Sequence, residues 1–292
     1  MHGHDLRALL QRFDAELTAG ITTPPPSRDE LACNVVMLDD ASCRVRAQMA
    51  IPAAFIDGIQ SAVTLAWRSA RPVGLQFAGA GAAVGGKLVA VHEQMRLVCA
   101  LEDEEWVRDA ALDVPVHVVE GETPSDVVRN VAECLGTMRE TLERELCGQL
   151  LEELDDQPGV IVCDGSIVGR SVDPRVCGVV KTTARRYLGD ESELWKLPKG
   201  WRSARFSIPA GVDMGVERHS CYVRLHDARR RPWDFALIRV ETFDADMCES
   251  VAALALADAQ DGSRSDARWD RHLRSVRNVE DLMRARRPAL FS

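Results

Sequence analysis

A carboxylate stands at the end of a short apolar stretch within residues 158–169, which read PGVIVCDGSIVG. Residues 160–162 are β-branched and lie between Pro-Gly and Asp-Gly-Ser, a pattern that predicts a buried central strand. Burying Asp164 at the tip of such a strand costs free energy unless a cation pairs with it, which makes Asp164 a candidate metal ligand. Asp-Gly-Ser is also common turn chemistry, so a structural turn is the alternative interpretation.

The periodicity of the surrounding segments predicts an α/β fold with a mixed sheet flanked by helices, an N-terminal helical arm and additional strands. The arm and its Pro-rich linker occupy residues 1–30, and residues 31–292 form the main domain. We expect helices at 5–17, 53–69, 126–154, 245–259 and 268–284, a three-stranded antiparallel meander within 73–103, and strands at 160–164, 176–181, 203–208, 221–225 and 235–241.

Composition and charge narrow the class of protein. The net charge is -9, yet residues from 160 onward carry 23 Lys and Arg against 19 Asp and Glu, whereas the preceding residues carry 13 against 26. A basic face could therefore lie on the C-terminal half only, and the alternative is that these arginines are ordinary solvated side chains. Nine scattered cysteines without a Cys-x-x-Cys pair disfavour a disulfide framework and a zinc site. Without an apolar run long enough to span a bilayer or a signal peptide, we expect a cytoplasmic protein with no membrane association.

Several short motifs recur in a fixed order. Asp164-Gly165-Ser166 ends one strand, a Gly-x-x-Lys segment follows at 178–181, and strands with the runs YVRL and IRVE come later at 222–225 and 238–241. This order resembles the ribonuclease H-like fold, and the motifs resemble those of the NurA family of prokaryotic DNA nucleases. The resemblance implies a homodimer that processes DNA ends together with a HerA-type hexameric ATPase, using Mn²⁺ or Mg²⁺.

Two-metal cleavage of a phosphodiester needs several carboxylates, and the helix before the Asp164 strand is expected to supply one. The strand from 159 to 164 spans about 17 Å. In an antiparallel helix, about eleven residues cover the same length, which leads back from Leu154 to Glu143. Glu140 and Glu145 are neighbours in reach, and Arg139 lies one turn away on the same face. The alternative is that these glutamates form a solvated helix face.

The sequence departs from the family pattern at two places. Aligning residues 74–81 with the family's first Asp-Gly-Ser strand places Ala78 where the first catalytic Asp belongs, and alanine cannot hold a metal. At the C-terminus, placing Trp269 on the family's tyrosine leaves Arg277 at the histidine position, with His272 five residues away. Both departures weigh against catalysis.

The basic residues on elements next to the expected site are candidates for contacts with DNA phosphates, from which the sequence-independent part of DNA affinity arises. They are Lys181, Arg185, Arg202 and Arg205. The leading hypothesis is therefore a NurA-like, metal-dependent deoxyribonuclease with Asp164 and Glu143 as catalytic metal ligands. The alternatives are an inactive NurA-like scaffold that dimerises and binds the ATPase, and an unrelated α/β protein in which Asp164 is only a turn residue.

Overall fold

The structure, a computed structural model, describes residues 35–49, 51–110, 114–153, 159–181, 187–188, 192–210, 216–228, 234–259 and 271–291. Within these residues, one sheet of 12 strands runs through the molecule. Its longest strands form an antiparallel meander toward one edge of the sheet, β3 (Ala53–Arg68), β4 (Arg71–Val84) and β5 (Lys87–Ala100). None of the helices in this part of the chain has the length and apolarity needed to cross a membrane.

The prediction of a helix at 53–69 was wrong, because this segment is the first strand of the meander. Its alanines and leucine favour helix locally, but β3 pairs with β4 along almost its whole length, and tertiary pairing overrides such weak preferences. The bounds of the predicted meander were also wrong, because residues 73–103 hold two strands, most of β4 and all of β5, rather than three. Strand β4 continues through Gly79 and Gly81, where a side chain would collide with Met283, and the chain turns instead at Gly85-Gly86, both with positive φ.

The long helix α3 (Pro124–Glu153) follows the meander, as predicted, and leads into β7 (Val160–Asp164) and β8 (Val176–Val180). Strand β7 pairs parallel with both β3 and β8, so these strands run in the same direction. The sheet continues through β12 (Leu237–Thr242), β11 (Arg218–Arg224), β10 (Phe206–Ile208) and β1 (Val36–Met37), and β6 (Val116–Val119) lies at the other edge.

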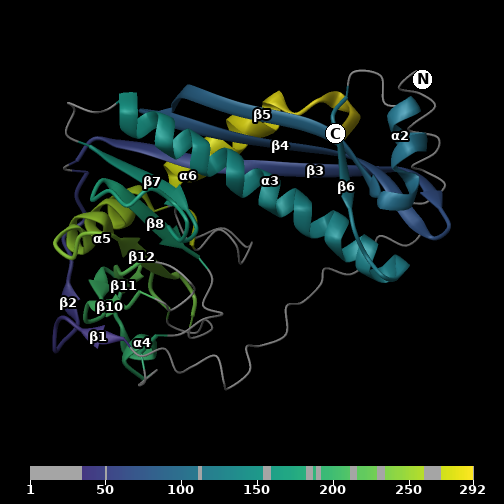
Figure 1. Cartoon of the computed structure of the whole chain (residues 1–292). Coiled ribbons are helices and arrows are strands. Elements are labelled where there is room, and N and C mark those ends of the chain that lie inside the picture. Colours follow the sequence, from purple (N-terminus) through teal and green to yellow (C-terminus); the bar gives the residue numbers. More distant parts are fainter. Residues whose placement is uncertain are drawn as a thin grey trace.

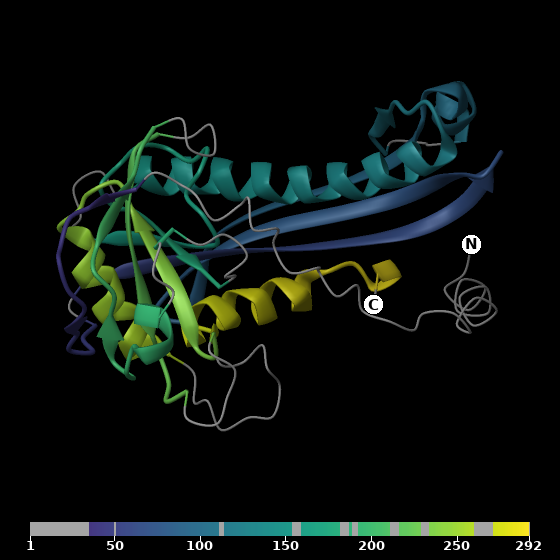
Figure 2. The same ribbon diagram turned by 90° about the horizontal axis from the view of Figure 1, so that it is seen from below.

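Helices cover both faces of the sheet. Helix α3 lies along one face of the meander, whereas α6 (Arg274–Arg286) packs against β3 and β4 on the other face (Figure 2). Helix α5 (Met247–Asp258) packs against β12 and β11 (Figure 1). The remaining short elements are β2 (Cys43–Arg44), β9 (Trp201–Arg202), α2 (Glu104–Ala110), α4 (Ser192–Lys196) and the 3₁₀ turns at Leu101–Asp103 and Ala289–Phe291.

The predicted fold class is confirmed: a mixed α/β sheet with three antiparallel strands, a crossing helix, a parallel central strand and additional strands. The strands expected near 160–164, 176–181, 203–208, 221–225 and 235–241 are all present, with shifted ends. The N-terminal helical arm at 1–30 lies outside the described residues, so it stays a prediction, as does the domain boundary.

The loop after β7 is held close to β8. The backbone N–H of Gly165, whose φ is +98°, donates to the carbonyl of Val179 at 2.9 Å. On the other side, the buried Glu241 of β12 accepts hydrogen bonds from the Ser166 hydroxyl at 2.6 Å and from the Ile167 N–H at 3.0 Å. Burial opposes ionisation of Glu241, but Arg239 and these hydrogen bonds outweigh it and keep the Glu241 pKa below its usual value.

We expect Gly178→Ala to destabilise this loop. A Cβ at Gly178 would lie 2.6 Å from the carbonyl oxygen of Gly165, and a backbone atom cannot move aside without displacing the loop. Overpacking of this kind costs about 1–3 kcal/mol of unfolding free energy. Urea unfolding followed by circular dichroism measures it. The control is Gly136→Ala in α3, where nothing lies within 4 Å and the change is expected to stabilise by about 1 kcal/mol. Equal effects of the two substitutions would contradict the close approach.

Candidate functional site

Two carboxylates lie side by side where β7 ends. The parallel register pairs Ile56 of β3 with Cys163 of β7, so Asp57 and Asp164 are the next residues on neighbouring strands. Alternate side chains of a strand point to opposite faces, which places Asp57 and Asp164 on the same face of the sheet. Figure 1 shows β3 and β7 adjacent in the sheet. The β3–β7 pairing thus joins residues that are more than a hundred positions apart in the sequence.

Asp57 is the more deeply buried of the two, with 5% of its surface exposed. Its Oδ1 atom accepts a hydrogen bond from the Gly58 N–H at 2.8 Å. Burial, followed by the nearby charge of Asp164, raises the Asp57 pKa well above its usual value, and Lys181 offsets only part of this. Asp57 therefore holds a proton more tightly than an ordinary aspartate when no additional cation is present.

Helix α3 contributes the third carboxylate, Glu143, which is 3% exposed. The side chain reaches the sheet because Gly58 leaves room for it: a Cβ at Gly58 would lie 2.4 Å from the Glu143 Oε1 atom. Arg139 and Arg170 flank the carboxylate at 3.1 and 2.9 Å. Burial raises the Glu143 pKa, and the two arginines partly counteract it.

Lys181 and His272 complete the group on the side of Asp164. The Lys181 Nζ atom lies 2.8 Å from the Asp164 Oδ2 atom and 3.5 Å from the His272 Nδ1 atom. Burial, together with the charge of Lys181, lowers the His272 pKa, which favours a neutral imidazole at pH 7. Arg271 donates to the Lys181 carbonyl at 2.8 Å and so ties the C-terminal segment to the end of β8.

Asp164 and Glu143 line a common cavity of about 290 Å³, the carboxylate pocket, with Asp57 next to it in the sheet. As the side chains stand, no three His, Cys, Asp or Glu residues in the described ranges are arranged to hold a metal ion. Lys181, Arg139 and Arg170 are paired with the carboxylates instead. Nevertheless, the Glu143 Oε1 atom receives no well-directed hydrogen bond, and Asp57 is buried beside another carboxylate. These oxygen donors suit a hard divalent cation such as Mg²⁺ or Mn²⁺.

The structure thus brings Asp164 and Glu143 to one cavity, as the spacing argument predicted, whereas their roles as catalytic metal ligands stay predictions. Glu140 lies at the rim of the same cavity. Glu145 points elsewhere, with its carboxylate 3.9 Å from His92 of β5. The prediction of a fully solvated glutamate face is wrong for Glu143, which is buried.

The placement of Ala78 at the first catalytic position was wrong. Ala78 belongs to β4, the second strand of the meander, and is fully buried against α3. The first strand is β3, and its carboxylate is Asp57, which the sequence analysis missed. The signal was present: an apolar run, Ala54–Ile56, leads directly into Asp57-Gly58, as residues 160–163 lead into Asp164-Gly165.

Of the three predicted DNA-contacting residues that the structure describes, only Lys181 lies at the carboxylates. Arg202 is 5% exposed and pairs with Asp39 at 2.7 Å. Arg205 pairs with the same carboxylate at 2.9 Å, which keeps the Asp39 pKa at about 2. These two arginines therefore form a structural ion pair with Asp39 near β9. Strands β11, β12 and β8 separate this place from β7 in the sheet. Arg185 lies outside the described residues.

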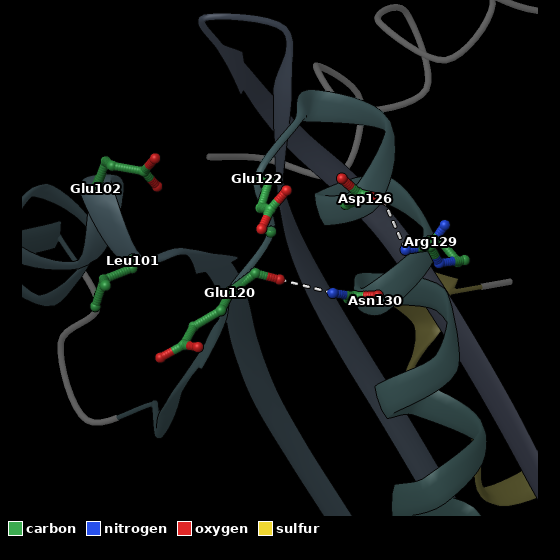
Figure 3. A pocket seen from close by; sticks show the side chains of 8 residues that line it. Leu101, Glu102, Glu120, Glu122, Asp126, Arg129 and Asn130 are labelled. Carbon is green, nitrogen blue, oxygen red and sulfur yellow. Dashed lines mark hydrogen bonds and ion pairs between the residues drawn. The ribbon is translucent and has the colours of Figure 1, made fainter.

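A second, larger cavity of about 720 Å³ lies at the opposite end of α3 (Figure 3). Four of its eight lining residues are acidic, Glu102, Glu120, Glu122 and Asp126, against one arginine, Arg129. Asp126 exchanges hydrogen bonds with Thr123 and thereby caps the N-terminus of α3, which explains its position. The negative charge disfavours binding of a polyanion there, so this cavity is not a candidate nucleic-acid site.

No protein-family model and no curated protein matches the sequence. Among solved structures, the chain is similar to the NurA nuclease from Sulfolobus solfataricus, with a TM-score of 0.45, 12% identity and coverage of 76% of this chain and 78% of that one. It is also similar to the catalytic domain of human Endonuclease V (TM-score 0.35, 15% identity, 98% of each chain covered). A further similar structure is human ENDOV (0.35, 16%, 96% of this chain and 97% of that one).

We expect Asp57→Asn to stabilise the protein at neutral pH in the presence of a chelator. The native state binds the Asp57 proton more tightly than the unfolded chain, whose aspartates titrate near pH 4. The native state therefore loses stability as the pH rises above about 4, by up to about 1.4 kcal/mol per pH unit until the folded pKa is reached. Asparagine removes this loss.

Thermal unfolding at pH 4 and pH 8 measures the difference between variant and wild type, which should be near zero at pH 4 and positive at pH 8. The matched control is Asp40→Asn, since the Asp40 side chain is exposed to solvent. A difference that is independent of pH, or equal for both variants, would contradict the burial of Asp57 beside Asp164.

Proposed function

We propose that this protein is a metal-dependent nuclease. One observation carries the proposal: three carboxylates, Asp57 of β3, Glu143 of α3 and Asp164 of β7, are brought to one end of a buried strand by three separate elements. Buried acidic groups of like charge oppose folding, so their convergence is explained best by a cation that binds there. Nuclease chemistry is the use of such a site that agrees with the motifs in the sequence.

Asp57, Glu143 and Asp164 would hold the divalent ions, which when bound supply Lewis acidity and an activated water to phosphodiester hydrolysis. The neighbouring side chains have separate tasks. Arg139 and Arg170 orient the Glu143 carboxylate, and Lys181 offers a positive charge to a substrate phosphate next to Asp164. His272, held neutral beside Lys181, can accept a proton at its ring nitrogen.

The ion pairs support a second candidate, a scaffold that keeps the fold without catalysis. The Lys181 ammonium is paired with the Asp164 carboxylate, and the Arg170 guanidinium is paired with the Glu143 carboxylate. Each cation stands where a metal ion would have to bind. A protein that had lost catalysis would be stabilised by such pairs, because they remove the repulsion between the carboxylates. In the nuclease, Lys181 must move from Asp164 toward the substrate phosphate when the metal binds. The two candidates therefore differ in whether metal competes with these ion pairs.

We further propose that the substrate is DNA and that the protein works as a homodimer with a HerA-type hexameric ATPase. This part rests on the order of motifs around Asp164-Gly165-Ser166, which resembles the NurA family. Co-purification with such an ATPase, and molar mass measured by light scattering, test the two assemblies separately from catalysis.

Replacement of the carboxylates tests the nuclease proposal. We expect wild type to cleave DNA only with Mn²⁺ or Mg²⁺, and Asp57→Asn and Asp164→Asn each to lose at least about 100-fold in rate, since even indirect ligand contacts contribute about 10–100-fold. The control, Glu140→Gln, removes a carboxylate one turn away with a 63% exposed side chain and should retain activity. Cleavage rates on labelled single- and double-stranded DNA provide the measurement.

Cleavage and thermal shift measured on the same proteins distinguish the nuclease from the scaffold. If wild type shows neither cleavage nor a thermal shift with Mn²⁺, the scaffold is supported and the nuclease proposal fails. Cleavage that survives a chelator, or that persists in Asp57→Asn, contradicts the metal site at these residues.

A further inference from the structure

A basic cleft lies directly beside the carboxylates. Strand β7 ends at Asp164, so beyond Asp57 the edge of β3 that faces away from β4 has no neighbouring strand in the part of the chain that the structure describes. A cavity of about 380 Å³ lies at this point, between the residues of β3, α3 and α6. Its lining residues are Gly58, Ile59, Gln60, Ser61, Arg139, Glu280, Arg284 and Arg287.

The charge of this cleft is positive. Three arginines face one carboxylate, Glu280, which is also paired with Arg277 at 2.9 Å. Arg284 contacts Glu280 but keeps a 49% exposed side chain, and Arg287 contacts the Ser61 hydroxyl at 3.4 Å. The Nε–H groups of Arg139 and Arg287 are buried and have no hydrogen-bond acceptor in the described ranges. The half-exposed Arg284 guanidinium is the donor that a ligand in the cleft can reach, and anionic oxygen atoms accept charge-assisted hydrogen bonds from such a group.

The cleft and the carboxylate pocket are neighbours that share a wall. Arg139 lines both cavities, and it pairs with Glu143 at 3.1 Å. Gly58 lines the cleft while its Cα faces the Glu143 carboxylate. A chain of phosphates that is bound in the cleft therefore reaches the carboxylates without crossing another element.

The size of the cleft selects the form of the ligand. A sphere of about 380 Å³ is roughly 9 Å across, narrower than the ~12 Å major groove of B-DNA alone. One sugar-phosphate strand fits such a hollow, whereas a duplex does not enter it. Gln60 and Ser61 add uncharged polar groups, which contact backbone oxygens without reading a base.

We infer that the cleft between β3, α3 and α6 binds the phosphodiester backbone of a single nucleic-acid strand and leads that strand to the carboxylate pocket. The inference rests on the proposed function for the purpose of the binding, but the binding itself requires no metal. It names Arg284 and Arg287 as phosphate contacts, and Arg139 as the residue at the junction of the two cavities. Neither Arg284 nor Arg287 follows from the sequence motifs.

The test is equilibrium binding in a chelator. Fluorescence anisotropy with a labelled single strand of about 15 nucleotides, a usual site size, gives the affinity and its salt dependence. The double variant Arg284→Gln, Arg287→Gln is expected to bind about tenfold more weakly. Its slope of log affinity against log salt between about 50 and 200 mM should fall by about 1.4, which is about 0.7 for each of the two phosphates that the variant no longer neutralises. Melting temperatures establish that the variant is folded.

The matched control is Arg286→Gln on the same helix, because Arg286 is directed to Glu93 at 2.7 Å and does not line the cleft. It should bind within about twofold of wild type with an unchanged salt slope. Wild-type affinity and slope in the double variant would overturn the inference. So would displacement of the strand by a polyglutamate peptide at equal charge concentration, which would assign an acidic protein partner, or an equal dependence of duplex binding on the two arginines.

The outcomes for strand binding and for cleavage test the two proposals separately. Asp57→Asn should bind the strand as wild type does, even though it is expected not to cleave. If wild type never cleaves but binding depends on Arg284 and Arg287, the inference stands and the nuclease proposal fails. If cleavage depends on Asp57 and Asp164 while binding ignores the two arginines, the nuclease proposal stands and the strand follows another route.

Discussion

The parallel pairing of β3 with β7 is the constraint on which the rest of the site depends. It places the buried Asp57 beside the partly exposed Asp164, and two neighbouring carboxylates repel each other when both are ionised. Cations from three elements offset this repulsion: Lys181 from the end of β8, Arg170 from the loop after β7 and Arg139 from α3. The fold therefore tolerates its central strand pair only as part of a larger charge network.

Residues that do not line the carboxylate pocket hold this charge network in place. Arg239 and Arg218 neutralise the buried Glu241, and Glu241 in turn fixes Ser166 and the backbone of Ile167. Removing one partner of such a buried pair leaves an uncompensated charge, which typically costs several kcal/mol. The serine of Asp-Gly-Ser is thus occupied in positioning the loop, while the aspartate is left for the site.

Local pattern was sufficient for some parts of the structure and insufficient for others. The Asp164 strand is a continuous apolar run between turn residues, and α3 has a regular apolar face. The ratio of helix rise to strand rise identified Glu143 because the two elements pack against each other in opposite directions. Strand β3 was missed because its composition favours a helix and only its pairing with β4 decides otherwise. Arg202 and Arg205 were misjudged for a similar reason: their partner, Asp39, is more than 160 positions away, and no local pattern indicates such an ion pair.

The acidic cavity at the start of α3 has a consequence for the helix as a whole. Asp126 and Glu143 are separated by 17 positions of one helix, or about 25 Å, which is about three Debye lengths at physiological ionic strength. At this salt concentration the charges at the two ends of α3 are screened from each other, so the carboxylates of the cavity have little effect on Arg139 and Glu143. As the ionic strength falls to about 0.01 M, the Debye length grows to about 30 Å, and the charges at the two ends then act on each other. The length of the thirty-residue helix therefore makes the electrostatic coupling between the two sites depend on the salt concentration.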